Sequence, residues 1–141
     1  MASKSLKVIF DTNVWISFLI GKRLLKIKKH LIDGQITIVT TDQLILEIRL
    51  VSAREKLKKY FPKESVEELI DLLETIALKI PIQPIHFLSR DPKDNFLLDL
   101  IDFSNADFLV TGDKDLLEFN PFKSAKIITP TEFEYLLRDG V

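Results

Sequence analysis

The chain has 141 residues, no cysteine and a formal net charge of −1, with 46% hydrophobic and 29% charged residues. This length and composition predict a single soluble domain over residues 1–141 and exclude a disordered chain. The lack of cysteine excludes disulfides and thiolate zinc sites and favours a reducing, cytoplasmic environment, while the nearly balanced charge excludes a general attraction to polyanions.

Short β-like runs alternate with helical patterns along the chain. In the first half we predict a strand at 6–10, helices at 14–20 and 23–33, a strand at 36–40, and a helix from Thr41 or Asp42 towards Tyr60. In the second half we predict a helix from Pro62 to Ile76, a weak edge strand at 85–87, a helix at 93–105, strands at 108–111 and 126–128, and a helix at 131–138. The alternation predicts a three-layer α/β/α domain with a mainly parallel central sheet of about five strands.

Four acidic residues stand where such a fold brings chain segments to one edge of its sheet. Asp11 ends the first strand, Asp113 follows the fourth, Glu47 lies one turn into a helix, and Asp94 opens another. Strand ends followed by helix starts are where open α/β sheets place ligands. Carboxylates gathered there repel one another unless a cation joins them, and Mg²⁺ and Mn²⁺ prefer such oxygen ligands. The pattern therefore predicts metal-assisted phosphate chemistry.

Each of these acids, taken alone, also has a purely structural explanation. Asp11 is a common type of turn or capping residue, and Asp113 lies in a turn-like segment. Asp94 would satisfy free N–H groups at the start of its helix, which is the favoured explanation for it in isolation. Glu47 would by default be a solvated surface charge. The convergence of all four in one fold is what favours a functional site.

Four segments around these acids carry motifs in a fixed order. They are residues 8–15 (VIFDTNVW), 90–95 (RDPKDN), 106–117 (ADFLVTGDKDLL) and 128–133 (ITPTEF). Together these segments closely resemble the PIN-domain family, and the nearest similarity is to the toxins of prokaryotic toxin–antitoxin modules. The resemblance extends over residues 6–137. It implies a sheet covered by helices on both faces and a metal-dependent ribonuclease activity.

The resemblance also implies which residues form the site. The family's catalytic acids correspond to Asp11, Glu47, Asp94 and Asp113 of this sequence. Asp115 is an auxiliary member, and Glu55, two turns after Glu47, is the competing candidate for the helical position. Asn13 and Thr12 are expected to fix the loop after the first strand through side-chain to backbone hydrogen bonds, and Thr111 to do the same beside Asp113.

The chemistry implied by the resemblance is hydrolysis of RNA phosphodiester bonds with Mg²⁺ or Mn²⁺. Asp11 and Asp94 would be direct metal ligands, and Asp113 would hold a second ion or a metal-bound water. Glu47 would orient or deprotonate the attacking water. One or two divalent ions can activate that water, relieve charge on the phosphate and assist the leaving oxygen.

Other functions are less compatible with the sequence. An aspartyl phosphatase of the haloacid dehalogenase type needs a second Asp two positions after the first, where this chain has Asn13. A zinc hydrolase would have only His30 and His86 as imidazole ligands, and they are far apart in sequence. The alternative that stays open is a PIN-like module that binds RNA or a protein without cleaving.

We expect protein partners, partly because of the family resemblance and partly because of apolar helix surfaces. The family implies a small antitoxin protein and frequent homodimers. Helix 14–20 has almost no polar face, and the helices near 44–51 and 66–76 are strongly apolar on one side, so we expect a homodimer. The alternative is that Trp15 and its neighbours are buried under the sheet. The N-terminal residues resemble neither a signal peptide nor a membrane span, so no membrane contact is expected.

Overall fold

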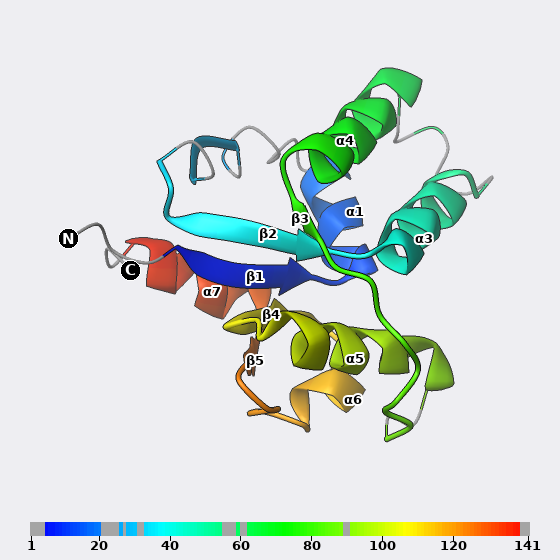
Figure 1. Cartoon of the computed structure of the whole chain (residues 1–141). Helices are drawn as coiled ribbons and strands as arrows, with labels where there is room; N and C mark the ends of the chain where they lie inside the picture. The colour runs from blue at the N-terminus through cyan, green and yellow to red at the C-terminus, as the bar shows by residue number, and fades with distance from the viewer. Residues whose placement is uncertain are drawn as a thin grey trace.

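Among the residues that the structure describes, five strands form a parallel sheet at the centre of the molecule (Figure 1). The structure is a computed structural model that describes residues 5–20, 26, 28–30, 33–54, 59, 62–88 and 91–138. The strands are β1 (Leu6–Phe10), β2 (Ile36–Thr40), β3 (Leu78–Lys79), β4 (Phe108–Val110) and β5 (Lys126–Ile128). They lie in the order β3-β2-β1-β4-β5, and every neighbouring pair is parallel. The predicted mainly parallel sheet is confirmed.

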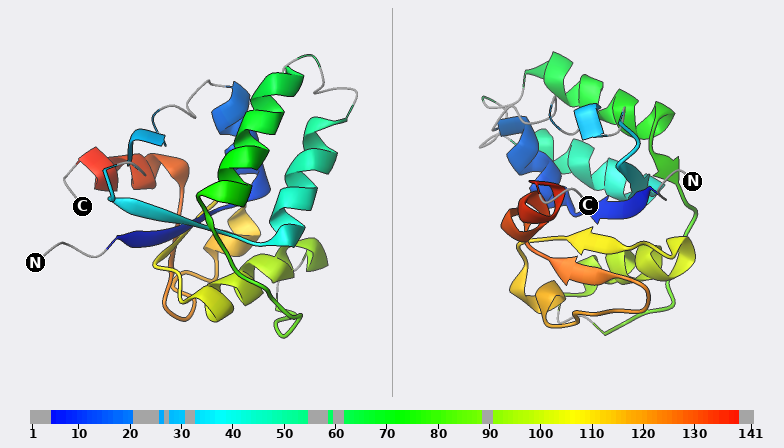
Figure 2. Two further views of the ribbon diagram at one scale, coloured as in Figure 1. Left: turned by 45° about the horizontal axis from the view of Figure 1, so that its top comes forward. Right: turned by 90° about the vertical axis from the view of Figure 1, so that its left-hand side faces the viewer.

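Helices lie on both sides of this sheet, which confirms the three-layer α/β/α arrangement (Figure 1, Figure 2). They are α1 (Thr12–Ile20), α3 (Asp42–Ser52), α4 (Lys63–Thr75), α5 (Asn95–Ser104), α6 (Lys114–Leu117) and α7 (Pro130–Arg138), with a 3₁₀ turn, η2 (Pro92–Asp94), before α5. α3 contacts both α1 and α4 on one side of β1 and β2, and α5 lies on the other. The chain progresses from β1 to β3 in one direction and from β3 to β5 in the other, so right-handed crossovers place these helices on opposite faces.

An aromatic cluster joins β1 to the helices on the side of α1. The Phe10 ring meets those of Trp15, Phe18 and Phe133 edge-on, at centroid distances of 5.0, 5.3 and 5.5 Å. Phe10 and Trp15 have no exposed surface. Such T-shaped contacts add to the free energy gained by apolar burial, roughly 0.5–1.5 kcal/mol for each pair. The apolar face of α1 is therefore part of the core, so Trp15 and its neighbours are buried under the sheet. Among the apolar residues of α1, only Ile20 is substantially exposed.

Two helix predictions are corrected by the structure. The helix predicted to run towards Tyr60 ends at Ser52, where the Ser52 hydroxyl donates to the Arg49 carbonyl and the Arg54 N–H donates to Val51, an i to i−3 contact that tightens the last turn. Ile76, predicted as the last residue of the following helix, lies just past α4 and is 60% exposed. Much of the helix predicted at 23–33 lies outside the described residues. Of those that are described, residues 26 and 28–30 are helical.

The edge strand predicted at 85–87 is wrong. The third strand of the chain is β3, and residues 80–88 form no strand. Pro81 and Pro84 have no N–H to give to a ladder, and the N–H groups of Ile85 and His86 both donate to Asp99 Oδ1, at 3.1 and 2.8 Å. A buried carboxylate thus takes the hydrogen bonds that a neighbouring strand would have accepted.

The helix predicted at 93–105 divides into two parts. Residues 92–94 form η2, and α5 ends at Ser104, followed by Asn105 in the left-handed conformation (φ 55°) that often terminates helices. The Asp91 side chain accepts from the Lys93 N–H at 3.0 Å and so caps η2, whose first residue is Pro92. Within the described residues no helix is long and apolar enough to cross a membrane.

Candidate active site

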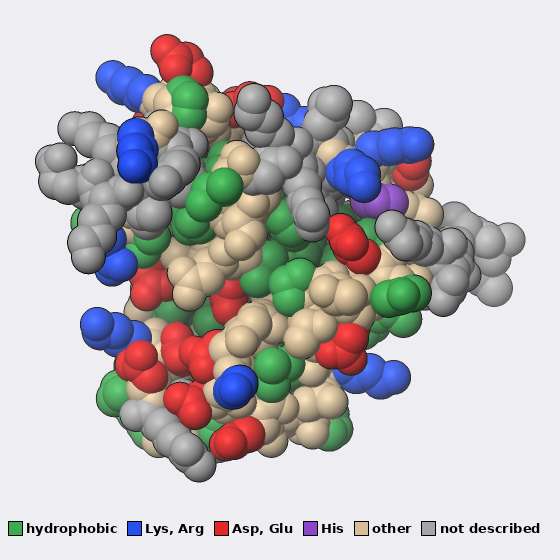
Figure 3. Space-filling view, turned by 180° about the vertical axis from the view of Figure 1, so that it is seen from behind, with side chains coloured by type: hydrophobic (Ala, Val, Ile, Leu, Met, Phe, Trp, Pro, Cys, Tyr) green, Lys and Arg blue, Asp and Glu red, His purple; other side chains and the backbone are tan. Residues whose placement is uncertain are grey.

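The strand order places two of the predicted acids side by side. β1 and β4 are neighbours, with Phe10 opposite Val110, yet β2 and β4 lie on opposite sides of β1. Open α/β sheets generally bind ligands beyond the carboxyl ends of the strands where the strand order reverses in this way. The Asp11 N–H donates to the Val110 carbonyl at 3.1 Å, so Asp11 lies beside the segment that leads to Asp113. Figure 3 shows Asp and Glu side chains gathered on the side to which the strand arrows of Figure 1 point.

Asp11 is held rigidly at the end of β1. Its side chain is buried, and its two oxygens accept hydrogen bonds from the Val14 N–H, at 2.9 Å, and from the Thr111 hydroxyl. Burial nevertheless raises the pKa of Asp11 above its ordinary value of 3.8, and the negative charges of Asp113 and Glu47 raise it further. The capping bond to Val14 shows that the structural explanation for Asp11 is correct, but the neighbouring acids show that it is incomplete.

Thr111 connects the first and last acids of the site. Its fully buried hydroxyl donates to Asp11 Oδ2 and accepts from the Asp113 N–H at 3.0 Å. The second contact is the predicted role of Thr111 beside Asp113. Asp113 also caps α6, because its Oδ1 accepts from the Asp115 N–H at 2.9 Å. A single hydroxyl therefore fixes the spacing between the ends of β1 and β4.

Asp94 is the acid least explained by structural needs. It occupies the N-cap position of α5 but makes no capping hydrogen bond, so the capping explanation is wrong for this residue. Its Oδ2 is buried and has no hydrogen-bond partner in the described part of the chain. Burial, a hydrogen bond to Asp113 and the charges of Asp113, Asp91 and Asp11 together raise the pKa of Asp94 to about 7. A proton on Asp94 would offset part of the negative charge of these neighbouring carboxylates, as a bound cation would.

Glu47 approaches the site from α3. Its side chain is half-buried, and its Oε2 accepts a 2.6 Å hydrogen bond from the Thr12 hydroxyl. Thr12 was expected to bond to the backbone, so this link between α1 and α3 corrects that prediction. The charge of Glu47 contributes to the raised pKa of Asp11, which places the two carboxylates in one electrostatic site. The competing candidate, Glu55, lies outside the described residues.

A family comparison agrees with this geometry. The family model of the PIN domain matches residues 7–115, a span that includes all four acids and Asp115. The chain belongs to the PIN-domain family. PIN domains are generally nucleases and usually use divalent metal ions. The chain is also similar to an uncharacterized protein of Methanocaldococcus jannaschii, with 28% identity over 144 aligned positions that cover 94% of this chain and 92% of that protein.

The acidic side chains of this PIN domain are suitable ligands for a divalent cation. Within the described residues no three carboxylate or imidazole groups are already arranged as a metal cluster. However, Asp94 Oδ2 is buried without a hydrogen-bond partner among the described residues, and burial and the neighbouring carboxylates raise the pKa of Asp94. Mg²⁺ and Mn²⁺ favour carboxylate oxygens and would relieve both features. Asp94, Asp113 and Asp11 are the residues that would hold such an ion.

The auxiliary residues of the PIN domain differ in their contacts. Asp115 is half-buried and adjoins the site through its backbone bond to Asp113, whereas Asn13 is exposed on the first turn of α1. Sequence reasoning missed the bond from Thr12 to Glu47 and the bond from Thr111 to Asp11. The available signal was a threonine next to a strand end in both motifs. Which partner each hydroxyl chooses depends on how the helices pack over the sheet.

Proposed function

We propose that this PIN domain is a metal-dependent endoribonuclease whose site is formed by Asp11, Glu47, Asp94 and Asp113. The observation that carries the proposal is Asp94 Oδ2, which is buried without a hydrogen-bond partner among the described residues and lies in a site shared with Asp113 and Asp11. Crowded carboxylates cost free energy in the folded state, and such costs are concentrated at functional sites. A divalent cation, when bound, would activate water and neutralise phosphate charge.

The residues of the site would have separate roles. Asp11 and Asp94 would hold the ion directly, and Asp113 would hold a second ion or a bound water. Glu47, oriented by the Thr12 hydroxyl, would accept the proton of the attacking water. The two hydrogen bonds to Asp11 keep that carboxylate in one orientation, which reduces the reorganisation needed when charge develops during the reaction.

Two exposed cations support a polyanionic substrate. Lys93 precedes Asp94 in η2, and Lys114 follows Asp113 at the first position of α6. They place positive charge at the edge of an otherwise acidic site, where the phosphates flanking the cleaved bond of an RNA strand would lie. A chain with a net charge of −1 needs such local groups because it has no general attraction to nucleic acid.

The direct test is incubation of the purified protein with single-stranded RNA in Mn²⁺, Mg²⁺ or EDTA. We expect endonucleolytic products with either metal and none in EDTA. Cleavage that persists in EDTA would exclude the metal mechanism. Binding of RNA without cleavage under all conditions would instead support the alternative of a non-cleaving PIN module.

We also propose that the protein is the toxin of a type II toxin–antitoxin module. This proposal is supported by the resemblance of its motifs to such toxins and by family membership. It requires a small antitoxin partner. The informative observation is whether a small open reading frame adjoins the gene and whether its product co-purifies with this chain and blocks cleavage.

The homodimer proposal is supported by exposed apolar side chains on α3. Leu46 and Leu50 are 56% and 60% exposed and lie one turn apart, so they form one stripe on the helix. We expect light scattering to give about twice the 16.3 kDa mass of one chain, and Leu50→Glu to halve it. A mass of one chain at every concentration tested would contradict the dimer while leaving the nuclease proposal intact.

A further inference from the structure

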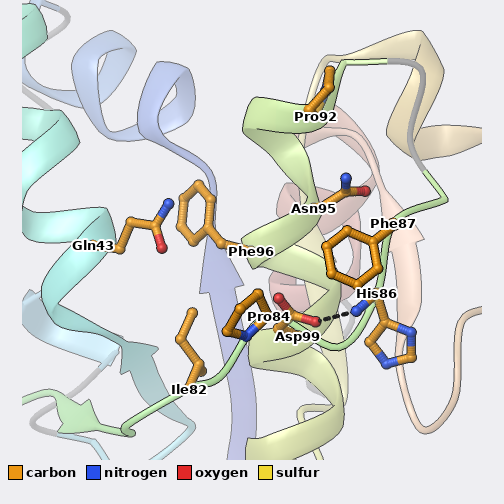
Figure 4. Close-up of a pocket in the computed structure, with 9 residues that line it drawn as sticks. All are labelled: Gln43, Ile82, Pro84, His86, Phe87, Pro92, Asn95, Phe96 and Asp99. Carbon is orange, nitrogen blue, oxygen red and sulfur yellow. Dashed lines mark hydrogen bonds between the residues drawn. The ribbon is translucent and has the colours of Figure 1, made fainter.

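A pocket of about 270 Å³ lies between the starts of α3 and α5 and the segment 80–88 (Figure 4). Phe96 and Pro84 are among its apolar lining residues, Gln43 and Asn95 contribute amide groups, and Phe87 lies at one side. The pocket is smaller than those that take drug-sized ligands, which range upward from about 300 Å³. It is therefore suited to one compact ring system rather than to a long peptide segment.

The pocket adjoins the acidic site on two elements. Asn95 directly follows Asp94 at the start of α5. Gln43 precedes Glu47 by one turn of α3, and residues four apart lie on the same side of a helix. A molecule with one part at the acids and another part in the pocket would span neighbouring positions on the same edge of the sheet.

One wall of the pocket is fixed before any ligand binds. Asp99, 2% exposed, accepts the N–H groups of Ile85 and His86, and His86 Nε2 lies 2.9 Å from Asp102 Oδ2. These contacts tie the segment to α5. Immediately after them Phe87 is 74% exposed. Phe87 therefore offers an exposed aromatic ring for stacking beside an apolar pocket, on a segment whose neighbouring residues are anchored to α5.

We propose that this pocket binds one unpaired nucleobase of the RNA strand, next to the phosphodiester bond that is cleaved. The inference rests on the proposed ribonuclease function and adds a subsite for one base beside the acids. A base would stack on Phe87 against the apolar lining, and the Gln43 amide, which can both donate and accept, would contact its edge. A paired base could not enter, because its edge would be occupied by its complement.

Binding can be measured independently of cleavage. A short RNA that contains 2-aminopurine is titrated with protein in EDTA, and its fluorescence reports stacking. We expect Phe87→Ala to weaken binding roughly tenfold, since one base stacked on an aromatic side chain contributes about 1–3 kcal/mol. Tyr135→Ala is the matched control, because Tyr135 is also an exposed aromatic (61%) but lies on α7 and does not line the pocket.

Cleavage provides the second measurement. An abasic nucleotide is placed at successive positions along the substrate to find the one at which kcat/KM falls. We expect Phe87→Ala to lower kcat/KM roughly tenfold on the intact RNA but not on the RNA that is abasic at that position. Gln43→Leu should reduce the differences in kcat/KM among substrates that carry the four bases there.

The outcomes separate this inference from the proposed function. If the wild type does not cleave but Phe87→Ala loses the fluorescence change, the ribonuclease proposal fails and the nucleobase pocket stands. If the wild type cleaves and Phe87→Ala matches Tyr135→Ala in both measurements, the nucleobase assignment is overturned while the ribonuclease proposal stands. Equal melting temperatures of the variants would show that both are folded.

Discussion

Asp94→Asn is expected to abolish RNA cleavage and, at the same time, to stabilise the metal-free protein at pH 8. The substitution keeps the shape of the side chain but removes a negative charge from a crowded site. Loss of one preorganised electrostatic contact commonly lowers kcat by about 10²–10³-fold, and we expect at least that loss here. The new amide N–H can donate to Asp113 whatever the pH, so the melting temperature should rise by several degrees, about 4 °C for each kcal/mol.

Asp91→Asn is the matched control, because Asp91 is an exposed neighbour that caps η2 through the Lys93 N–H. An Asn caps nearly as well as an Asp, so Asp91→Asn should change stability little and leave cleavage measurable, whereas Asp91→Ala should cost about 1 kcal/mol. Wild-type kcat/KM in a well-folded Asp94→Asn protein would contradict the role proposed for Asp94. A lower melting temperature for Asp94→Asn would contradict the crowding argument.

The second large effect is a pH dependence of stability that bound metal reverses. In the folded state the pKa values of Asp11 and Asp94 both lie above the ordinary value of 3.8, and that of Asp94 is raised to about 7. Burial is the main cause, and the neighbouring carboxylates add to it. The folded state therefore binds more protons than the unfolded state between about pH 4 and pH 7, and stability must fall as pH rises through this range. In EDTA the melting temperature should be higher at pH 5 than at pH 8.

Binding of a divalent metal ion should restore the stability that the protein loses as pH rises. An ion that binds only the folded protein at 100 times its Kd adds about 2.7 kcal/mol, or roughly 10 °C for a chain of this size. Mn²⁺ should therefore raise the melting temperature at pH 8 and much less at pH 5, where protons compete for the same oxygens. Identical melting curves in EDTA and in millimolar Mn²⁺ at pH 8 would count against a preformed site. In the Asp94→Asn variant, both the change of melting temperature with pH and the rise in melting temperature caused by Mn²⁺ should be smaller than in the wild type.

The sequence by itself determined the framework of this PIN domain. The predicted strands 36–40 and 126–128 begin and end at the residues that the structure shows, because each is a short apolar run between turns. The positions of Asp11 and Asp113 also followed from sequence, since an acid at the end of a parallel strand must lie at the carboxyl edge of the sheet. The strand predicted at 85–87 was wrong. The apolar run there gives no sign that Asp99, thirteen or more residues away, accepts the N–H groups of Ile85 and His86.

Only the tertiary structure decided what each acid of the site experiences. In sequence, Asp91 and Asp94 are equally good caps, but the fold gives the capping bond to Asp91. Asp94 Oδ2 is buried and has no partner in the part of the chain that the structure describes. The same packing directs the Thr12 hydroxyl to Glu47 and exposes Phe87 beside a pocket. Desolvation and charge repulsion depend on distances between segments far apart in the chain, so no local pattern of residues contains them.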